Sequence, residues 1–330
     1  METKKPLYWS TLKMYEECPQ KCLWSRGRPG VDLGAGPGRR KPVQDLRSEH
    51  HLVMGCVIAD VMERLYNDEL YKEPARLISR LRELVETFFE AEMSKRHIDY
   101  GAWGCPDRDE MLRICVDGTL GYIRTMKQNR ILGTYARAEV DLRTQIDKWN
   151  PVGGRADLIV TRPDTGTTIY DGKNSKYVGK YTDPDQLRWY ALMYFLAYGK
   201  LPDRLAFIYF RYPAGAPPDE GIPPDSEWDG LVEVPFTRDD IKGIAERAKT
   251  VGKAMWKGEW DPTPSPTVCK FCDYENVCEA RQGQKESNRR RKKPAMLDGV
   301  DGVVQFGFGG VPDGRPAVSP EVPQEDEDDE

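Results

Sequence analysis

Gly153-Gly154-Arg155-Ala156-Asp157-Leu158-Ile159-Val160 is the stretch that decides the fold of this 330-residue chain. A turn-rich connector, Pro163-Asp164-Thr165-Gly166, leads from it into a second β-prone run, Thr167-Thr168-Ile169-Tyr170-Asp171-Gly172-Lys173. Two short apolar runs joined by Pro, Asp and Gly predict a β-hairpin. Side chains alternate along a strand, so Asp171 and Lys173 point to the same side. With Asp157 on the other arm, we expect two carboxylates and one ammonium to meet at one edge of the sheet.

This combination of side chains favours metal-dependent chemistry on a phosphate. Carboxylate oxygens are the ligands that Mg²⁺ prefers in proteins. A lysine beside the metal can orient a water molecule or stabilise the charge that develops on a phosphate. The alternative is that Asp171 and Lys173 form only a surface ion pair, because Asp-x-Lys triplets arise by chance on many exposed strands.

A third motif, Gln186-Leu187-Arg188-Trp189-Tyr190, follows the hairpin. Taken in order, Asp157, Asp171-Gly172-Lys173 and this motif resemble the Asp…(Asp/Glu)-x-Lys…Gln-x-x-x-Tyr pattern of RecB-like nucleases in the PD-(D/E)XK superfamily. The resemblance implies an α/β fold with a restriction-endonuclease-like core, in which helices flank a mixed β-sheet. It also implies a metal-dependent DNA exonuclease.

The catalytic roles that the resemblance implies concern four residues. Asp157 and Asp171 are expected to bind Mg²⁺ or Mn²⁺, and Lys173 is expected to position the attacking water or offset charge in the transition state. Glu139, on the strand before Asp157, stands where such nucleases often place an additional acidic group. The alternative for Glu139 is a solvated strand residue.

The DNA-binding residues that the resemblance implies are Gln186, Arg188 and Tyr190. Gln186 and Tyr190 are four residues apart and share one face of a helix. For Gln186 a capping role is the alternative, because Asp183 fits the N-cap and Pro184 the first helical position. Tyr190 can equally be a core residue. A helix N-terminus at this place would itself favour a phosphate.

One feature of the related nucleases is missing from this chain. Many of them carry a histidine in a Gly-x-x-x-His helix, but Gly55 is followed four positions later by Ala59. His50 and His51 lie about one turn upstream and can replace that histidine only if the backbone is displaced. A histidine ligand to the metal is therefore left open.

Four of the eight cysteines form a second candidate metal site. Cys269, Cys272 and Cys278 lie within ten residues, and a closed site needs a fourth thiolate, for which we expect Cys18, with Cys22 as the alternative. One distant N-terminal cysteine with three C-terminal ones resembles the iron–sulfur nucleases of the AddB and CRISPR-associated exonuclease type. The resemblance implies a [4Fe–4S] cluster that pins the two ends of the chain together. Zn²⁺ is the alternative metal.

Composition and charge limit the remaining possibilities. Apolar residues are 39% and charged residues 31%, no apolar run approaches a membrane span, and the N-terminus leads to no signal-peptide core. We therefore expect a cytoplasmic protein with reduced cysteines and no membrane contact. Residues 281–330 carry eight Lys or Arg and eleven Asp or Glu, which accounts for −3 of the net charge of −5. Any DNA site must therefore be a local groove.

Periodicity and composition divide the chain into four parts. An N-terminal cysteine motif and a helical subdomain are expected over 1–132, the nuclease core over 133–260, the C-terminal cysteine cluster over 261–281, and a disordered tail, basic and then acidic, over 282–330. Residues 26–42 are expected to form an irregular loop. Helices are expected at about 10–18 with Ser10 as the cap, 43–70, 74–97, 107–129, 183–199 and 237–257, the last with a capping box at Thr237. Strands besides the hairpin are expected at about 134–142, 204–212 and 230–236.

The function that the resemblance implies is DNA exonuclease activity, with single-stranded ends as the substrate. Such an enzyme serves recombination, repair or CRISPR spacer capture, and either a cellular genome or a phage can encode it. The alternative is a non-catalytic DNA-binding or adaptor protein that keeps the fold and the cluster. The basic run 289–293 can contact DNA, and the acidic residues 325–330 can screen the DNA site or bind a protein partner. The alternative for both segments is a solvated tail that makes no contact. Polarity of digestion and exonuclease against endonuclease preference are left open.

Overall fold

The structure is a computed structural model, and it describes residues 6–26, 48–102, 104–132, 135–175, 178, 182–212, 215, 228–270, 272, 274–275 and 278–283. Residues 1–283 form one unit and residues 284–330 a second. The basic run 289–293, the acidic residues 325–330 and most of the expected loop over 26–42 lie outside the described residues. In the ranges that the structure describes, no helix is long and apolar enough to cross a membrane.

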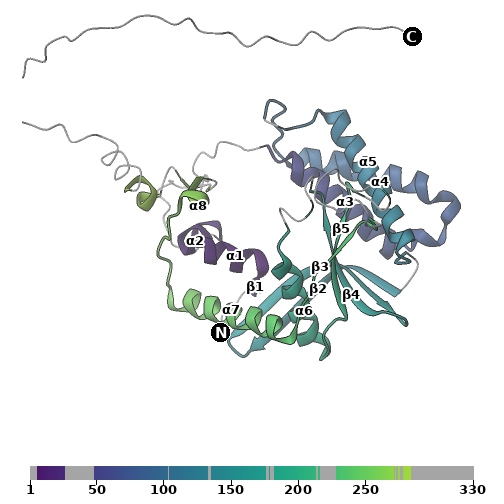
Figure 1. The fold of residues 1–330 in the computed structure, drawn as a ribbon. Coiled ribbons are helices and arrows are strands. Elements are labelled where there is room, and N and C mark those ends of the chain that lie inside the picture. Colours follow the sequence, from purple (N-terminus) through teal and green to yellow (C-terminus); the bar gives the residue numbers. More distant parts are fainter. Residues whose placement is uncertain are drawn as a thin grey trace, which may run out of the picture. The chain divides into compact units, whose positions relative to one another are not determined.

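A six-stranded mixed sheet lies at the centre of the first unit (Figure 1). The long strand β3 (Asn150–Arg162) pairs antiparallel with β2 (Tyr135–Asp147) on one edge and with β4 (Gly166–Lys173) on the other. β5 (Arg204–Tyr209) runs parallel to β4, and β6 (Leu231–Glu233) pairs antiparallel with β5. The predicted hairpin is thereby confirmed, since β3 and β4 are joined by the turn at 163–165.

The edge of β3 that faces β4 has a second neighbour. Residues 158–162 pair with β4, whereas Val152 and Gly153 pair in parallel with the two-residue strand β1 (Leu7–Tyr8), which the sequence did not predict. Because β2 occupies the other edge, β1 and β4 must share this one. The ladder is therefore interrupted between Gly153 and residue 158, in the segment that contains Asp157.

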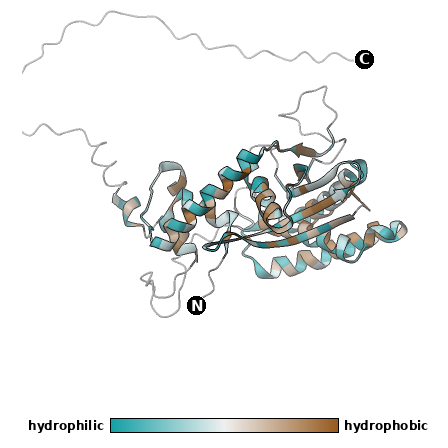
Figure 2. Cartoon of the chain, turned by 90° about the horizontal axis from the view of Figure 1, so that it is seen from below, coloured by the Kyte–Doolittle hydropathy of each residue, from teal (hydrophilic) through white to brown (hydrophobic). Residues whose placement is uncertain are grey.

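Helices α3 (His50–Asn67), α4 (Pro74–Lys95) and α5 (Arg108–Gln128) cover one face of the sheet, with the short 3-10 helix Leu70–Lys72 between α3 and α4. Their buried side chains pack with Leu158, Val160 and Ile208 of the strands. Colouring by hydropathy shows hydrophobic and hydrophilic sides on the helices (Figure 2). The helices expected as an N-terminal subdomain thus form a layer on the sheet.

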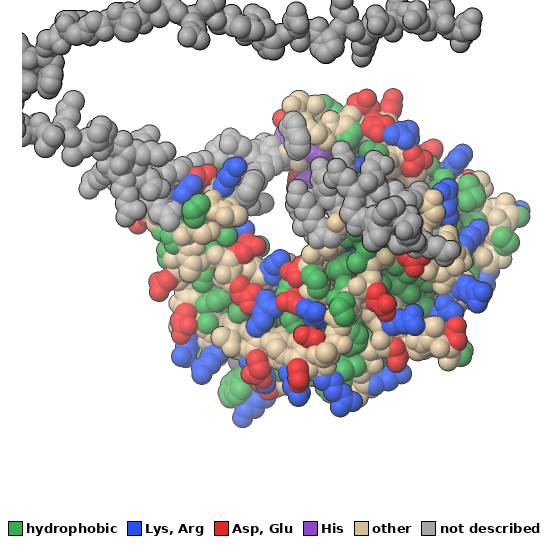
Figure 3. Space-filling view, viewed as in Figure 1, with side chains coloured by type: hydrophobic (Ala, Val, Ile, Leu, Met, Phe, Trp, Pro, Cys, Tyr) green, Lys and Arg blue, Asp and Glu red, His purple; other side chains and the backbone are tan. Residues whose placement is uncertain are grey.

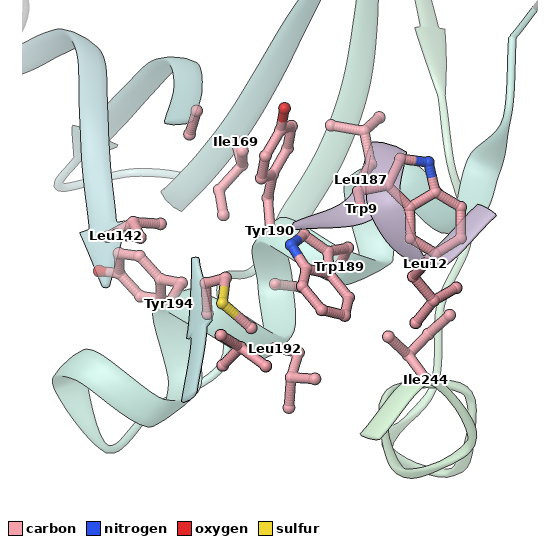
Figure 4. Packing of buried hydrophobic residues seen from close by; sticks show 14 of the residues in the cluster. Trp9, Leu12, Leu142, Ile169, Leu187, Trp189, Tyr190, Leu192, Tyr194 and Ile244 are labelled. Atoms are coloured by element: carbon pink, nitrogen blue, oxygen red, sulfur yellow. The ribbon is translucent and has the colours of Figure 1, made fainter. Parts of the chain in front are cut away.

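Helices α1 (Trp9–Glu17), α6 (Pro184–Tyr198) and α7 (Arg238–Lys257) cover the opposite face, and the short helices α2 (Pro19–Arg26) and α8 (Pro266–Lys270) follow α1 and α7. Side chains of α1 and α7 meet those of α6 around Trp189 (Figure 4), and the rings of Trp9 and Trp189 lie 6.0 Å apart. The sheet is therefore enclosed between two layers of helices.

Gly153 and Gly154 allow this close packing on β3. Trp189 Nε1 donates a hydrogen bond to the Gly153 carbonyl oxygen at 3.1 Å. A Cβ on Gly154 would lie 3.1 Å from the ring of Tyr190, and a Cβ on Gly153 would lie 3.0 Å from the ring of Tyr8. Side chains at these two positions would push α6 and β1 away from the strand.

Most of the predicted helix ends are confirmed, with two corrections. The helix expected from residue 43 begins only at His50, and residues 48 and 49 are not helical. Thr237 and Asp240 form the predicted capping box of α7, and Asp183 caps α6 by accepting a hydrogen bond from the backbone of Asp185. The prediction of Ser10 as a cap is wrong. α1 begins one residue earlier with Tyr8 at the N-cap and no side-chain cap, because strand β1 continues directly into the helix.

Candidate active site

A row of three acidic residues crosses strands β2, β3 and β4. The β2–β3 register on both sides of Glu139 places this residue opposite Asp157. Continuing the β3–β4 register by one residue from the pair Leu158–Tyr170 places Asp171 beside Asp157. Neighbouring strands are about 4.8 Å apart in a regular sheet, so three carboxylates from adjacent strands occupy one small region.

At this row, the alternation of side chains between the two faces of the sheet shifts by one residue on strands β2 and β3. Glu139 has a φ of +50°, in the left-handed region that non-glycine residues rarely adopt. Ala138 packs with the α3–α5 side chains, but Val140, two residues later, packs with those of α1, α6 and α7. On β3, Ala156 packs with the side chains of α1, α6 and α7, but Leu158, two residues later, packs with those of α3–α5. Irregularities of this kind re-aim side chains and are common next to active sites.

Lys173 and Gln186 surround Asp171. Lys173 Nζ lies 2.6 Å from Asp171 Oδ2 and donates a hydrogen bond to Gln186 Oε1 at 2.8 Å. Gln186 Nε2 donates to Asp171 Oδ1 at 2.9 Å and lies 3.4 Å from Tyr190 Oη. The Gln186 side chain is therefore used in this network, and does not act as a capping-box partner for α6. The hairpin and the first turns of α6 meet at this point.

Asp157 joins the network through the backbone of β4. Its Oδ2 atom accepts a hydrogen bond from the N–H of Gly172 at 2.8 Å. A side chain at position 172 would overlap the ring of Phe210. Glycine between Asp171 and Lys173 thus lets β4 pack closely while its N–H holds Asp157.

The two aspartates lie in densely packed protein, although part of the Asp157 surface is exposed. Asp171 is only 2% exposed, and burial raises its pKa against the opposing charge of Lys173. Burial and then the charge of Asp171 raise the pKa of Asp157 well above its usual range. Two adjacent carboxylates with little water around them repel each other, and a bound cation would relieve this repulsion.

Glu139 contacts Arg155, which links it to Glu63, and the sequence analysis singled out neither of these residues. Arg155 Nε lies 2.6 Å from Glu139 Oε2, and Arg155 Nη2 lies 3.2 Å from Glu63 Oε2 on α3. Burial raises the pKa of Glu139 to about 7, the charge of Arg155 opposes this shift, and Glu63 and Asp60 add to it. Only the packing of α3 against the sheet brings Glu63 here, so no local signal in the sequence marks it.

Arg188 and the two histidines considered from the sequence have other partners in the part of the chain that the structure describes. Arg188 donates to Asp185 Oδ1 at 2.8 Å and to the Pro235 carbonyl oxygen at 3.0 Å, which ties α6 to the segment before α7. His50 and His51 lie at the start of α3 with their rings 5.5 Å apart. Arg188 therefore uses two of its nitrogens within the protein, its Nε atom is buried without a hydrogen-bond partner among the described residues, and the expected DNA contact stays a prediction.

Whether a divalent cation fits here depends on the oxygens that are present. In the described part of the chain, no three His, Cys, Asp or Glu side chains are grouped as the ligands of one metal ion. Asp171 Oδ2 is nevertheless a buried carboxylate oxygen whose neighbour is the Lys173 ammonium, at 2.6 Å. Together with Asp157 and Glu139 it provides the carboxylate chemistry that suits Mg²⁺ or Mn²⁺.

Four cysteines of the candidate cluster line one small cavity: Cys18, Cys269, Cys272 and Cys278. Their thiols are free, and burial raises the pKa of Cys272, with Cys18 and Cys269 adding to the rise. Cys22 is buried elsewhere, with its Sγ atom 3.7 Å from the carbonyl oxygen of Thr11. The cavity therefore favours Cys18 over Cys22, although these described thiols are not grouped as metal ligands.

The surface is hollowed above the sheet. Figure 3 shows the hollow between the part built from α1, α2 and α8 and the part built from α3, α4 and α5. Acidic and basic side chains gather along its lower rim (Figure 3).

Comparison with known proteins identifies a family for this chain. The family described as the PD-(D/E)XK nuclease superfamily matches residues 9–279. Among solved structures, the one titled "Crystal structure of SSO0001" is similar at 18% sequence identity and a TM-score of 0.30, over 52% of this chain and 78% of that chain. Curated proteins give no match. Because the family match spans most of the sequence, the chain belongs to the PD-(D/E)XK nuclease superfamily.

Proposed function

We propose that this protein is a metal-dependent DNA exonuclease whose active site is formed by Asp157, Asp171 and Lys173, with Gln186 and Tyr190 beside them. Members of the superfamily are nucleases, so the substrate is a nucleic acid. The observation that supports the assignment most is the side-chain amide of Gln186, which bonds to both Asp171 and Lys173. Residues that are distant in the sequence meet there in one hydrogen-bonded group.

The protein side chains have distinct tasks in this proposal. Mg²⁺ or Mn²⁺, held by Asp157 and Asp171 with Glu139 assisting, would supply Lewis-acid activation of the scissile phosphate and of the attacking water. Lys173 is fixed by Asp171 and Gln186, so its ammonium is already in place to stabilise negative charge on the phosphate. Burial strengthens this effect because less water screens the charge.

Single-stranded DNA ends are the substrate that we favour. The hollow between the two groups of helices (Figure 3) suits a strand that enters by a free end. Gln186, in the first turn of α6, is hydrogen-bonded to Lys173, so the N-terminus of this helix lies near Lys173. A helix N-terminus favours a phosphate.

Linear and circular single strands of the same sequence provide the test. The linear strand should be degraded with Mn²⁺ or Mg²⁺ and protected by EDTA, and the circular strand should resist. Cleavage of the circle would contradict the exonuclease assignment. Absence of cleavage of both strands with either metal would contradict nuclease activity and favour the non-catalytic DNA-binding alternative.

The proposal includes a [4Fe–4S] cluster on Cys18, Cys269, Cys272 and Cys278. The shared cavity supports it, because thiolates are the ligands of such clusters. The segments that carry these cysteines already pack together, since Tyr15 Oη donates to the Glu259 carbonyl oxygen at 2.5 Å and Thr263 Oγ1 donates to that of Glu17 at 3.0 Å. When bound, the cluster would supply a covalent link between them.

Protein purified without oxygen tests this part. It should be brown, and its absorption should bleach in air. Cys18→Ser should abolish the colour, whereas Cys22→Ser, the matched control, should keep it. A metal analysis that finds only zinc would contradict the iron assignment, and loss of colour in the Cys22 variant alone would contradict the ligand set.

A further inference from the structure

Arg211 is a half-buried arginine at the edge of the sheet that carries the candidate active site. β4 and β5 are parallel, and Lys173 pairs with Tyr209, so their C-terminal ends share one edge. Arg211 follows two residues after β5, and its Nε atom donates a hydrogen bond at 3.1 Å to Oδ1 of Asn174, the residue after Lys173. Its guanidinium therefore lies beside the end of the strand that carries Asp171 and Lys173.

Arg211 makes no ion pair within the described ranges. Its other contact is weak, with Nη2 4.0 Å from the sulfur of Met54. The acidic residue with most influence on it, Glu110 of α5, is already bonded to Arg113 at 2.7 and 2.8 Å. Burial lowers the pKa of Arg211, which shows that the charged form is disfavoured at this position. A cation that is partly buried without a carboxylate gains most from a bound anion.

The remaining donors of Arg211 suit a phosphate. A guanidinium has five N–H donors in a planar fork, and only Nε has a strong acceptor here. The outer edge of that fork can bond two phosphate oxygens at once. Arg155 and Arg188, also near the site, are by contrast each paired with carboxylates.

We infer that Arg211 binds a phosphate of the DNA strand next to the nucleotide being cleaved. The inference rests on the proposed function. Contacts to the phosphate backbone fix the register of a bound strand without selecting its sequence. Arg211 would therefore hold the strand while Lys173 faces the scissile phosphate, and it would add to affinity for every sequence equally.

The salt dependence of DNA binding tests the contact. A fluorescein-labelled single strand is titrated with the full-length protein in Ca²⁺ over a range of salt concentrations. Losing one phosphate contact in Arg211→Gln should lower the slope of log Kd against log salt by about 0.7 and weaken binding by roughly tenfold or more. Arg211→Lys should keep the slope and lose part of the affinity. Arg204→Gln, at the opposite end of β5, is the matched control and should bind as the parent does.

Substitution of single phosphates by uncharged methylphosphonate locates the contact. One position should weaken binding of the parent protein and have no effect on Arg211→Gln. Equal sensitivity of the two proteins, with melting curves that show both folded, would overturn the inference. If Arg211→Gln does not fold, Arg211→Met is compared instead, and sensitivity equal to that of the parent would overturn the inference. Binding is measured without cleavage, so a protein that fails to cut DNA contradicts the proposed function and leaves this result unaffected.

Discussion

At the scale of single residues, Gln186 holds Asp171 and Lys173 in place relative to each other. Its amide oxygen accepts from Lys173 and its amide nitrogen donates to Asp171, so one side chain fixes both groups. Gln186→Ala should lower kcat by about 10- to 100-fold, as the loss of a residue that orients metal ligands does, with little change in DNA affinity. Tyr190→Phe removes only a hydroxyl 3.4 Å away and should have a smaller effect. Parental kcat in Gln186→Ala would contradict this role.

At the scale of secondary-structure elements, Arg247 of α7 connects its helix to α1 and α6. It bonds Glu16 of α1 at 2.8 and 3.0 Å and Asp185 of α6 at 2.6 Å, and it lies over the ring of Trp9. Asp185 precedes Gln186, so this contact also supports the candidate active site. Arg247→Gln should lower the melting temperature by a few degrees and reduce cleavage.

Lys249→Gln is the control for this prediction, because the ion pair of Lys249 with Glu246 lies within α7. Its melting temperature and activity should stay close to those of the parent. Equal effects of the two substitutions would show that the bridge between helices has no special importance.

Glu92 gives the α3–α5 layer a pH dependence. This buried carboxylate accepts hydrogen bonds from Lys95 at 2.7 Å and Arg96 at 2.8 and 3.0 Å, and these bonds lower its pKa. A lowered pKa in the folded state stabilises the protein above the usual pKa of Glu, and this stabilisation is lost as the pH falls through the folded value. Glu92→Gln should cost about 1.5–3 kcal/mol at neutral pH.

Denaturant unfolding at several pH values checks this prediction. The difference in unfolding free energy between the parent and Glu92→Gln should be largest near neutral pH and shrink as the pH drops below about 4. Glu83→Gln, which alters an exposed ion pair on the same helix, is the control. A difference that does not change with pH would contradict the assignment.

The sequence predicts those elements whose signals are local. The hairpin follows from two apolar runs around a turn, whereas the meeting of Gln186 with Asp171 and Lys173 is what the resemblance to RecB-like nucleases implies. The change of orientation at Glu139 was not predictable, because a left-handed residue inside a strand leaves no periodic signal. The contact of Arg155 with Glu63 depends on how a distant helix packs on the sheet.

At the scale of the whole molecule, the segment around Cys18 packs against the segment that carries Cys269. A cluster that links Cys18 to Cys269 would close a loop of about 250 residues, which in a chain-entropy account stabilises the fold by about 5 kcal/mol. Removal of the metal by a chelator should therefore lower the melting temperature strongly. The same treatment of Cys18→Ser should have little further effect, because its link is already lost. Equal losses in the two proteins would show that the metal acts elsewhere.

Single-turnover cleavage by Lys173→Ala tests the central assignment most directly. The parent, Lys173→Ala and the control Lys200→Ala, which alters an exposed lysine just after α6, are compared on a labelled single strand with Mn²⁺. In the proposed mechanism the ammonium of Lys173 acts on the reacting phosphate, so its loss should slow cleavage by about 100-fold or more while DNA affinity stays within a few-fold of the parent. Lys200→Ala should cleave at the parental rate. Cleavage by Lys173→Ala at the parental rate would contradict the active site described for this protein.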